Sequence, residues 1–336
     1  MECLYDRINR HFIKIEDSSE VDYRVRIHID NSAHGLYLNK LGELNYTPTV
    51  ISYCTTEKGT IRSKKYILNG NIVINPPTQE ALWILNNDAT DITFLGRESA
   101  INNFHRNFYI FFEHIITKKC IEKGAVMIHS AAVKAVDGVV LYIGKKRAGK
   151  TTLFFESCGR RMMQPISVDK TLICREGDKL IAYGVPTRLR VLAGTLSKYE
   201  ELNHFVPEKF RNVDSHVLWR GESDGKIEMC IGDFEKFAHT KFVPFGQLAK
   251  IVACSIKQEN TVPIKKVGFD SFFLNSLRNS IYSPDNPEED WWSEIGLRKR
   301  VELQKNTEEI LNDIQQNIEG SSYFASSDLN DLYLYN

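Results

Sequence analysis

The sequence has no long apolar run, no excess of charge of one sign and no paired cysteine motif. Without about 18 consecutive apolar residues no membrane-spanning helix is expected, and residues 1–7 lack the apolar core of a secretory signal peptide. Lysine plus arginine and aspartate plus glutamate each number 43, which argues against wholesale nucleic-acid binding. The seven scattered cysteines include no C-x-x-C, as is typical of reduced thiols rather than disulfides or a zinc site. We therefore expect a cytoplasmic protein without a nucleic-acid or membrane partner.

What the sequence does contain is ordinary for a globular protein. Of its 336 residues 42% are hydrophobic and 26% are charged, and this length suits one large or two modest domains. Changes in pattern predict a strand-rich N-terminal domain over residues 1–97, a connecting helix over 98–124, a central domain over 125–284, and a C-terminal helix and tail over 285–336. The predicted fold class is α/β, with a mixed sheet in the central domain.

In the N-terminal domain, alternating apolar residues and turn signals predict short strands. Asn69-Gly70 is typical of a tight hairpin turn, and the two prolines at 76 and 77 end one strand before a short helix. His28 and His34 are interpreted as surface or packing residues. The predicted elements are strands at residues 23–29, 61–68, 71–75 and 91–95 and a helix at residues 79–85.

The connecting helix is predicted from an aromatic stripe with helical spacing. Gly124 follows as a stop signal. The stripe could cradle a ligand, but core packing is the favoured interpretation. The stripe consists of Ile101, Phe104, Phe108, Phe111 and Ile115.

The clearest motif follows the apolar strand Val139–Ile143, where Gly144–Thr151 fits G-x-x-x-x-G-K-[ST], the phosphate-binding loop. Glycines allow the loop amides to converge on a phosphate in front of a helix N-terminus. Lys150 is expected to reach the β and γ phosphates, and the Thr151 hydroxyl to hold Mg²⁺. A glycine turn with a solvated lysine is the alternative. The expected nucleotide-binding residues are Gly144, Lys145, Lys146, Arg147, Ala148, Gly149, Lys150, Thr151 and Thr152.

The strand before the loop is expected to form half of an antiparallel hairpin. Residues 125–133 predict a strand interrupted by His129, and Asp137-Gly138 predicts a tight turn back into Val139–Ile143. Most phosphate-loop proteins instead place this strand in a parallel βαβ unit. After the loop we expect a helix that Gly159 ends, strands at 165–174, 179–184, 226–231 and 248–256, and helices at 196–210, 268–282 and 287–320, with a loosely held tail over 321–336.

A phosphate loop alone binds a nucleotide, whereas phosphoryl transfer also needs a carboxylate for the metal and a group that positions the nucleophile. Asp169, an acid within the apolar strand 165–174, is the candidate metal ligand and catalytic acid–base; a solvated strand-edge carboxylate is the alternative. His129 is the other catalytic candidate; the alternative is a core histidine whose hydrogen bonds are satisfied within the fold. Arg188 and Arg190 share a strand face and could clamp a phosphate or an acidic substrate, or be solvated. Lys145, Lys146 and Arg147 either strengthen triphosphate binding or are solvated.

These segments resemble, in order, the catalytic domain of HPr kinase/phosphorylase, which shares its fold with phosphoenolpyruvate carboxykinase. The resemblance covers about residues 120–270 and is carried by Met127–Ala131, Gly138–Thr151, Ser167–Asp169 and Pro186–Arg190. The overall layout is more similar to HPr-kinase-related proteins found with peptide-modification genes, including kinases of lasso-peptide precursors. The resemblance implies ATP- and Mg²⁺-dependent phosphorylation of a hydroxyl, usually a serine of a peptide or protein, and it favours a homo-oligomer. The sequence itself leaves the choice between ATP and GTP open.

Carried over by position, the resemblance assigns phosphate binding to Gly144–Thr151 and metal binding to Thr151. It matches His129 to the family's histidine on the strand before the loop and places Asp169 in the family's paired-aspartate motif. Together with the reasoning from the residues, the catalytic candidates are Lys150, Asp169 and His129, and the candidate metal ligands are Thr151 and Asp169. The sequence departs from the family at its paired-aspartate motif, because only Asp169 is acidic there. If Asp169 holds only the metal, the general base is either missing or supplied by another residue, for which His129 is the candidate. The predicted function is a kinase acting on a peptide or protein hydroxyl; the alternatives are a non-catalytic, nucleotide-gated peptide-binding module and a small-molecule hydroxyl kinase.

Overall fold

The computed structural model describes residues 24–56, 59–77, 80–87, 90–102, 117, 119–185, 187, 189–211, 213, 218, 226–256, 264–282 and 300–325. These residues divide into two compact units, the first containing those up to 117 and 300–304, the second containing 119–282 and 305–325. None of the helices that the structure describes combines the length and the apolar character needed to cross a bilayer.

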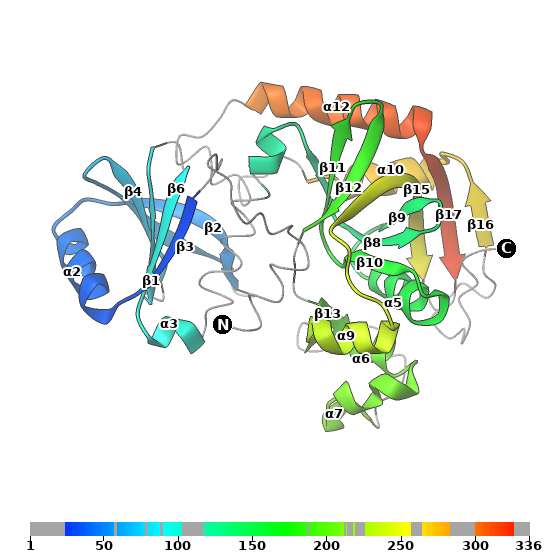
Figure 1. Ribbon diagram of the computed structural model, residues 1–336, viewed down its shortest axis with the longest axis horizontal. Helices are drawn as coiled ribbons and strands as arrows, with labels where there is room; N and C mark the ends of the chain where they lie inside the picture. The colour runs from blue at the N-terminus through cyan, green and yellow to red at the C-terminus, as the bar shows by residue number, and fades with distance from the viewer. Residues whose placement is uncertain are drawn as a thin grey trace. The chain divides into compact units, whose positions relative to one another are not determined.

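The first unit is a six-stranded sheet with α2 on one face (Figure 1). The strand order is β1-β6-β5-β4-β3-β2, and only the β1–β6 pair is parallel. The side chains of Leu41, Tyr66, Val73 and Leu82 form the core between α2 and the sheet. The elements are β1 Arg24–Ile29, α2 Asn31–Gly42, β2 Thr47–Thr56, β3 Gly59–Leu68, β4 Asn71–Asn75, β5 Ala81–Leu85, β6 Asp91–Gly96 and α3 Ser99–Asn102.

The structure confirms the four strands predicted in this unit, and it corrects the predicted helix at residues 79–85. Ala81–Leu85 is a central strand, β5, in which Trp83 is fully buried and packs edge-on against Phe94 with ring centroids 5.1 Å apart. A short continuous apolar run fits a buried strand as well as a helix, so its pattern could not decide between them. His34 is a buried packing residue whose Nδ1 accepts a hydrogen bond from Arg97 Nε at 3.1 Å. The connecting helix falls mostly outside the described residues.

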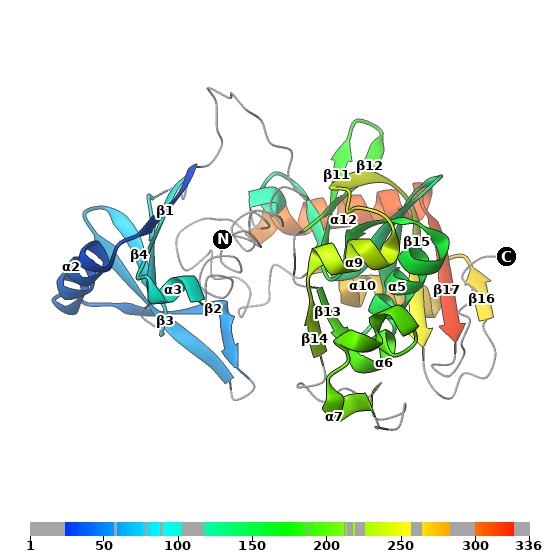
Figure 2. The same cartoon turned by 60° about the horizontal axis from the view of Figure 1, so that its bottom comes forward.

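The second unit is built on a nine-stranded mixed sheet (Figures 1 and 2). Its main path runs β10-β8-β9-β15-β12-β11-β7, and β17 pairs with both β15 and β16. The strand β9 is antiparallel to β8 and parallel to β15, which confirms the predicted hairpin and the mixed sheet. The strands are β7 Val126–Ile128, β8 Ser130–Ala135, β9 Gly138–Ile143, β10 Gln164–Ser167, β11 Thr171–Glu176, β12 Lys179–Gly184, β15 Phe245–Ile256, β16 Ile264–Val267 and β17 Glu319–Ala325.

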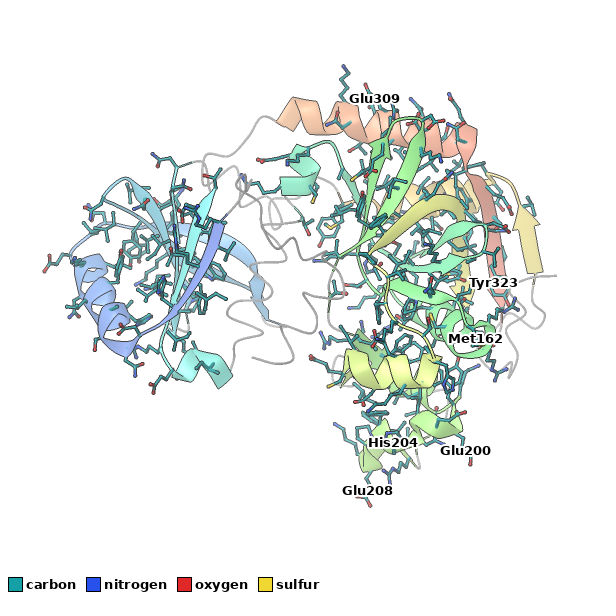
Figure 3. The ribbon with its side chains drawn as sticks, viewed as in Figure 1. Met162, Glu200, His204, Glu208, Glu309 and Tyr323 are labelled. Atoms are coloured by element: carbon teal, nitrogen blue, oxygen red, sulfur yellow. The ribbon has the colours of Figure 1, made fainter. Side chains whose placement is uncertain are left out.

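Helices cover both faces of this sheet. One core cluster packs α5, α9 and the separate two-stranded ribbon β13–β14 against side chains such as Tyr142 and Val252, and a second cluster packs α10 and α12 against side chains such as Leu141 and Ile173. The short helices η2 and α7 project Glu200, His204 and Glu208 outward (Figure 3). The remaining elements are α5 Lys150–Arg161, β13 Leu189–Leu192, α6 Ala193–Leu196, η2 Glu200–Phe205, α7 Glu208–Arg211, β14 Lys226–Met229, α9 Ile231–Ala238, α10 Ser271–Ser280 and α12 Arg300–Asn317.

Several predicted boundaries in this unit are wrong. Helix α5 continues through Gly159 to Arg161 instead of ending there. A Cβ at this position would lie 2.4 Å from Phe237 Cζ, so the glycine allows close packing and does not terminate the helix. The predicted helix over residues 196–210 is three short helical segments. The C-terminal tail is not loose throughout, because Glu319–Ala325 forms β17 inside the sheet. Of the helix predicted over 287–320, α12 is the described part.

The predicted strands 125–133 and 165–174 are each broken, and the breaks lie side by side. The first divides into β7 and β8 at His129, and the second divides into β10 and β11 around Asp169. The halves pair with each other, β8 with β10 and β7 with β11. At each break a polar side chain interrupts an otherwise buried strand.

Candidate functional site

The loop between β9 and α5 is held against the end of β15. Gly144 and Gly149 have φ angles of 146° and 98°. A Cβ on Gly144 would lie 2.8 Å from the Cys254 carbonyl oxygen, and one on Gly149 would lie 2.5 Å from Ile256 Cδ1. Both positions therefore require glycine for conformation and for space. The Ile256 amide donates to the Ala148 carbonyl at 2.9 Å, which fixes the loop to the strand.

The loop ends at the N-terminus of α5. Gly149 is the N-cap residue and makes no side-chain cap, so the amides of the first turn keep their capacity to bind an anion. Arg147 has a φ of 69°, a conformation that costs a non-glycine residue energy and is concentrated at functional sites. The first turn contains Thr151, and Thr152 Oγ1 lies 3.2 Å from Thr195 Oγ1 of α6. The loop therefore leads directly into α5, and its N-cap residue supplies no side chain to the first-turn amides.

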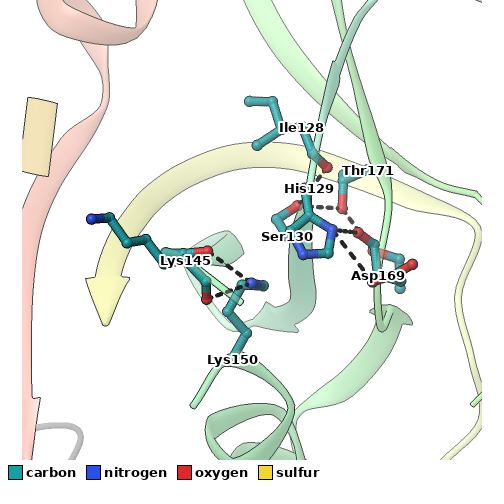
Figure 4. A network of polar contacts seen from close by, with 9 residues as sticks. Ile128, His129, Ser130, Lys145, Lys150, Asp169 and Thr171 are labelled. Carbon is teal, nitrogen blue, oxygen red and sulfur yellow. Dashed lines mark hydrogen bonds and ion pairs between the residues drawn. The ribbon is translucent and has the colours of Figure 1, made fainter. Parts of the chain in front are cut away.

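Lys150 is buried and folds back over the loop. Its Nζ donates to the carbonyl oxygens of Gly144 at 2.8 Å and Lys145 at 3.2 Å (Figure 4). Burial lowers the pKa of Lys150 below its ordinary value, while Asp169 is among the groups that oppose this shift. A buried ammonium whose acceptors are backbone carbonyls is held in a fixed position with little solvent around it, where it interacts strongly with a nearby anion.

His129 and Asp169 meet at the two strand breaks (Figure 4). His129 Nδ1 lies 3.0 Å from the Asp169 carbonyl oxygen and 3.3 Å from Asp169 Oδ1. Because a carbonyl oxygen only accepts, Nδ1 carries the proton, and in the neutral ring Nε2 is the acceptor. Burial, followed by the positive charge of Lys150, lowers the pKa of His129 below 6.5. The neutral imidazole is therefore the favoured form near pH 7.

Buried hydroxyl groups lie beneath these two residues. Ser130 Oγ donates to Thr171 Oγ1 at 2.9 Å, and Thr171 Oγ1 lies 2.6 Å from Ser167 Oγ (Figure 4). All three residues are essentially inaccessible to solvent. They join the first residue of β8, the last of β10 and the first of β11, so the hydroxyl network fixes both breaks and with them His129 and Asp169.

Most of the predicted site residues line one pocket of about 310 Å³. It brings together His129, Asp169, Arg190 and residues 146–152. Gly144 and Lys145 do not line it; their carbonyls bind Lys150 instead. Arg188 lies outside the described residues. Apart from these predicted residues, the pocket is lined by Val168, Leu192, Thr195, Lys226 and Ile256.

Lys226 is the charged pocket residue that the sequence interpretation missed. It starts β14, which pairs with β13 so that Lys226 lies opposite Leu192. The sequence predicted a strand at residues 226–231 but not its partner, and only the pairing with β13 brings Lys226 to the pocket. Burial, Arg190 and the loop residues Lys146 and Arg147 lower its pKa, against the opposing effect of Asp169.

No protein-family model matches this sequence. No curated protein sequence matches it either. Among solved structures, the chain shows partial similarity to the HPr(Ser) kinase/phosphatase from Coxiella burnetii, with 14% identity and a TM-score of 0.25 over 43% of this chain and 77% of that one.

Proposed function

We propose that the second unit is a nucleotide-dependent kinase that transfers a phosphoryl group to a hydroxyl of a peptide or protein, most simply a serine. The observation that supports this proposal is the meeting, in one pocket, of an uncapped helix N-terminus, a buried lysine, a threonine, a carboxylate and a histidine. These are the parts that phosphoryl transfer requires: an anion cradle, a metal ligand set and a group that takes the hydroxyl proton.

The residues present fit a magnesium nucleotide. Among the described residues no three His, Cys, Asp or Glu side chains gather into a metal site of their own, and Mg²⁺ is commonly held by one or two protein ligands together with substrate phosphates. Thr151 and Asp169 would hold the metal, and ATP or GTP when bound supplies the phosphoryl group. The first-turn amides of α5 and Lys150 bind and orient the phosphates.

In this proposal His129, rather than Asp169, takes the proton of the acceptor hydroxyl. Its Nδ1–H is fixed by the Asp169 carbonyl oxygen, and its lowered pKa keeps Nε2 unprotonated near neutral pH. Asp169 then holds the imidazole through its backbone carbonyl, and its carboxylate would hold the metal. This division of roles needs only one aspartate, so the missing second acid of the resembled family is compatible with catalysis.

The proposal is tested by comparing Lys150→Ala with Lys145→Ala. The Lys145 side chain is exposed and does not line the pocket, so its replacement controls for the loss of one loop charge. We expect Lys150→Ala to lower nucleotide turnover with serine peptides by about 10²–10³-fold, since it removes a fixed positive charge at the transferring group. Lys145→Ala is expected to change turnover less than about threefold. Equal turnover for both variants and the unaltered protein would refute the proposal.

A second candidate, a non-catalytic nucleotide-gated binding module, is favoured by one observation: Asp169 is the only carboxylate among the described residues of the pocket. This second function predicts that the protein binds a nucleotide in a way that depends on Lys150 but transfers no phosphoryl group to any hydroxyl. Binding and transfer measured on the same preparations therefore separate the two functions.

A further inference from the structure

The β13–β14 ribbon has an apolar face and a polar face. Leu189, Val191 and Met229 are fully buried in the core. Because side chains alternate along a strand, Arg190 and Leu192 of β13 lie on the opposite face. Antiparallel pairing places Glu228 opposite Arg190, and Lys226 opposite Leu192. This face of the ribbon therefore carries Glu228 directly opposite Arg190, and two cations, Arg190 and Lys226, that are diagonal neighbours about 7–8 Å apart at their backbones. Both cations line the pocket, whereas Glu228 does not.

The pocket receives positive charge from two separate sources. The loop and the first residue of α5 supply Lys146, Arg147 and Lys150, and the ribbon supplies Arg190 and Lys226. Among the described residues that line the pocket, these five cations face a single carboxylate, that of Asp169; Glu228 does not line the pocket. The phosphate tail of a nucleotide with its metal carries only a modest net charge, which the loop cations and helix N-terminus can balance alone.

We propose that Arg190 and Lys226 form a second anion subsite, which binds a carboxylate or phosphate carried by the phosphoryl acceptor. This inference rests on the proposed function, in which the donor fills the loop side. It defines the acceptor as an acidic or phosphorylated molecule that presents its anion to the ribbon and its hydroxyl to His129.

The chemistry of the two side chains suits this role. Arginine presents a planar fork of N–H donors that matches a carboxylate or phosphate, and lysine adds a compact charge that can approach from the side. The mutual repulsion of Arg190 and Lys226 is relieved when an anion lies between them. Consistent with this, the pKa of Lys226 is lowered, first by burial and, among its neighbours, by Arg190.

The test uses the full-length protein saturated with the non-hydrolysable nucleotide AMPPNP, so that the loop is filled. Inorganic phosphate, a blocked serine pentapeptide with aspartates on both sides of the serine, and the same peptide with asparagines are titrated by calorimetry. We expect phosphate and the aspartate peptide to bind, and the asparagine peptide to bind at least about tenfold more weakly. Tighter binding of phosphate assigns a phosphorylated acceptor, whereas tighter binding of the aspartate peptide assigns an acidic one.

Arg190→Gln and Lys226→Gln are each expected to weaken binding of the anionic probes about tenfold and to leave AMPPNP affinity within about twofold. The control is Lys236→Gln on α9, whose side chain is 83% exposed and does not line the pocket. The inference is overturned if no probe binds, if the two variants bind probes normally, or if both lose AMPPNP affinity, which would assign the ribbon to the donor.

Failure of the proposed function gives a different result. AMPPNP that binds equally to the unaltered protein and to Lys150→Ala overturns the loop's role. Phosphate titrations without nucleotide then still report on the ribbon, through the Arg190 and Lys226 variants.

Discussion

At the scale of single residues, burial lowers the pKa of two side chains in the pocket. Burial is the largest cause of the lowered pKa of both His129 and Lys150, because it disfavours a charged form. The charge of Lys150 lowers the pKa of His129 further, and the carbonyl and carboxylate of Asp169 oppose this only in part. The imidazole is thus kept in the state that can accept a proton.

The role proposed for His129 as the catalytic base predicts a pH dependence. In a kcat/KM profile we expect an acidic limb with a pKa below 6.5, the ordinary histidine value, and a plateau at neutral pH where Nε2 is free of a proton. His129→Gln is expected to remove this limb and to lower kcat by about 10²–10⁴-fold. His204→Gln, at an exposed site outside the pocket, is the control. An unchanged acidic limb in His129→Gln would exclude His129 as the base.

The same shift affects stability in a defined direction. The unfolded state has the higher histidine pKa, so between the lowered folded pKa and 6.5 it binds more protons than the folded state. The free energy of unfolding therefore rises with pH across this window and is flat above it as far as His129 is concerned. Urea unfolding of the unaltered protein and of His129→Gln at several pH values measures the difference.

At the scale of elements, the two strand breaks decide where the site forms. If these two strands were continuous, the side chains of His129 and Asp169 would each point to one of the two buried faces of the sheet, and neither could line a pocket. The breaks let both side chains turn out of the sheet. Backbone hydrogen bonds across the breaks, such as the one that the Ser130 amide donates to the Asp169 carbonyl at 3.1 Å, provide partners for the polar backbone groups there. The buried hydroxyl network then fixes their relative position.

Thr171→Val tests this network, because valine keeps the shape of threonine and removes only its hydroxyl. Ser167 and Ser130 each lose a buried partner, so the free energy of unfolding is expected to fall by about 1–3 kcal/mol. If the network positions His129 and Asp169, kcat falls with little change in KM, and Thr171→Ser restores it. A loss of stability with unaltered kcat would show that the network only supports the fold.

At the scale of the whole molecule, the second unit is completed by the C-terminal segment. Strand β17 lies between β15 and β16 in the sheet, parallel to β15, and α12 covers one of the core clusters through Ile310 and Ile314. The ion pair between Arg175 and Asp313 further links α12 to β11. Residues distant in the chain are therefore required for the sheet that carries the loop.

We expect a chain that ends after Asn317 to be largely insoluble or to melt well below the full-length protein, because it removes β17, unpairs β16 and exposes the edge of β15. A chain that ends after Ala325 keeps every described element and is the matched control. Soluble yield and thermal melting monitored by circular dichroism compare the two. Equal melting temperatures would show that β17 contributes little to the unit.

The elements that could be predicted from the sequence depend on short-range interactions, whereas the predictions that the structure corrects depend on contacts between different elements. The loop, the hairpin before it, and the strands at Asn71–Asn75 and Phe245–Ile256 were predictable, at least in outline, because each depends on neighbouring residues: glycines, a turn dipeptide, an apolar run. The helix predicted at residues 79–85 was wrong because the pairing of Ala81–Leu85 with β4 and β6 decides that it is a strand. The stop assigned to Gly159 was wrong because this glycine gives room to Phe237 of α9.

What the sequence determined by itself was the glycine-bounded loop between β9 and α5 and the identity of its main candidate partners, since the two glycines and the helix start lie within a run of eight residues. What only the tertiary structure decided was which side chains surround it. The breaks at His129 and Asp169 and the pairing that brings Lys226 to the pocket arise from strand-to-strand contacts. A pattern along one chain cannot specify them, because hydrogen bonding between strands depends on which segments meet in space.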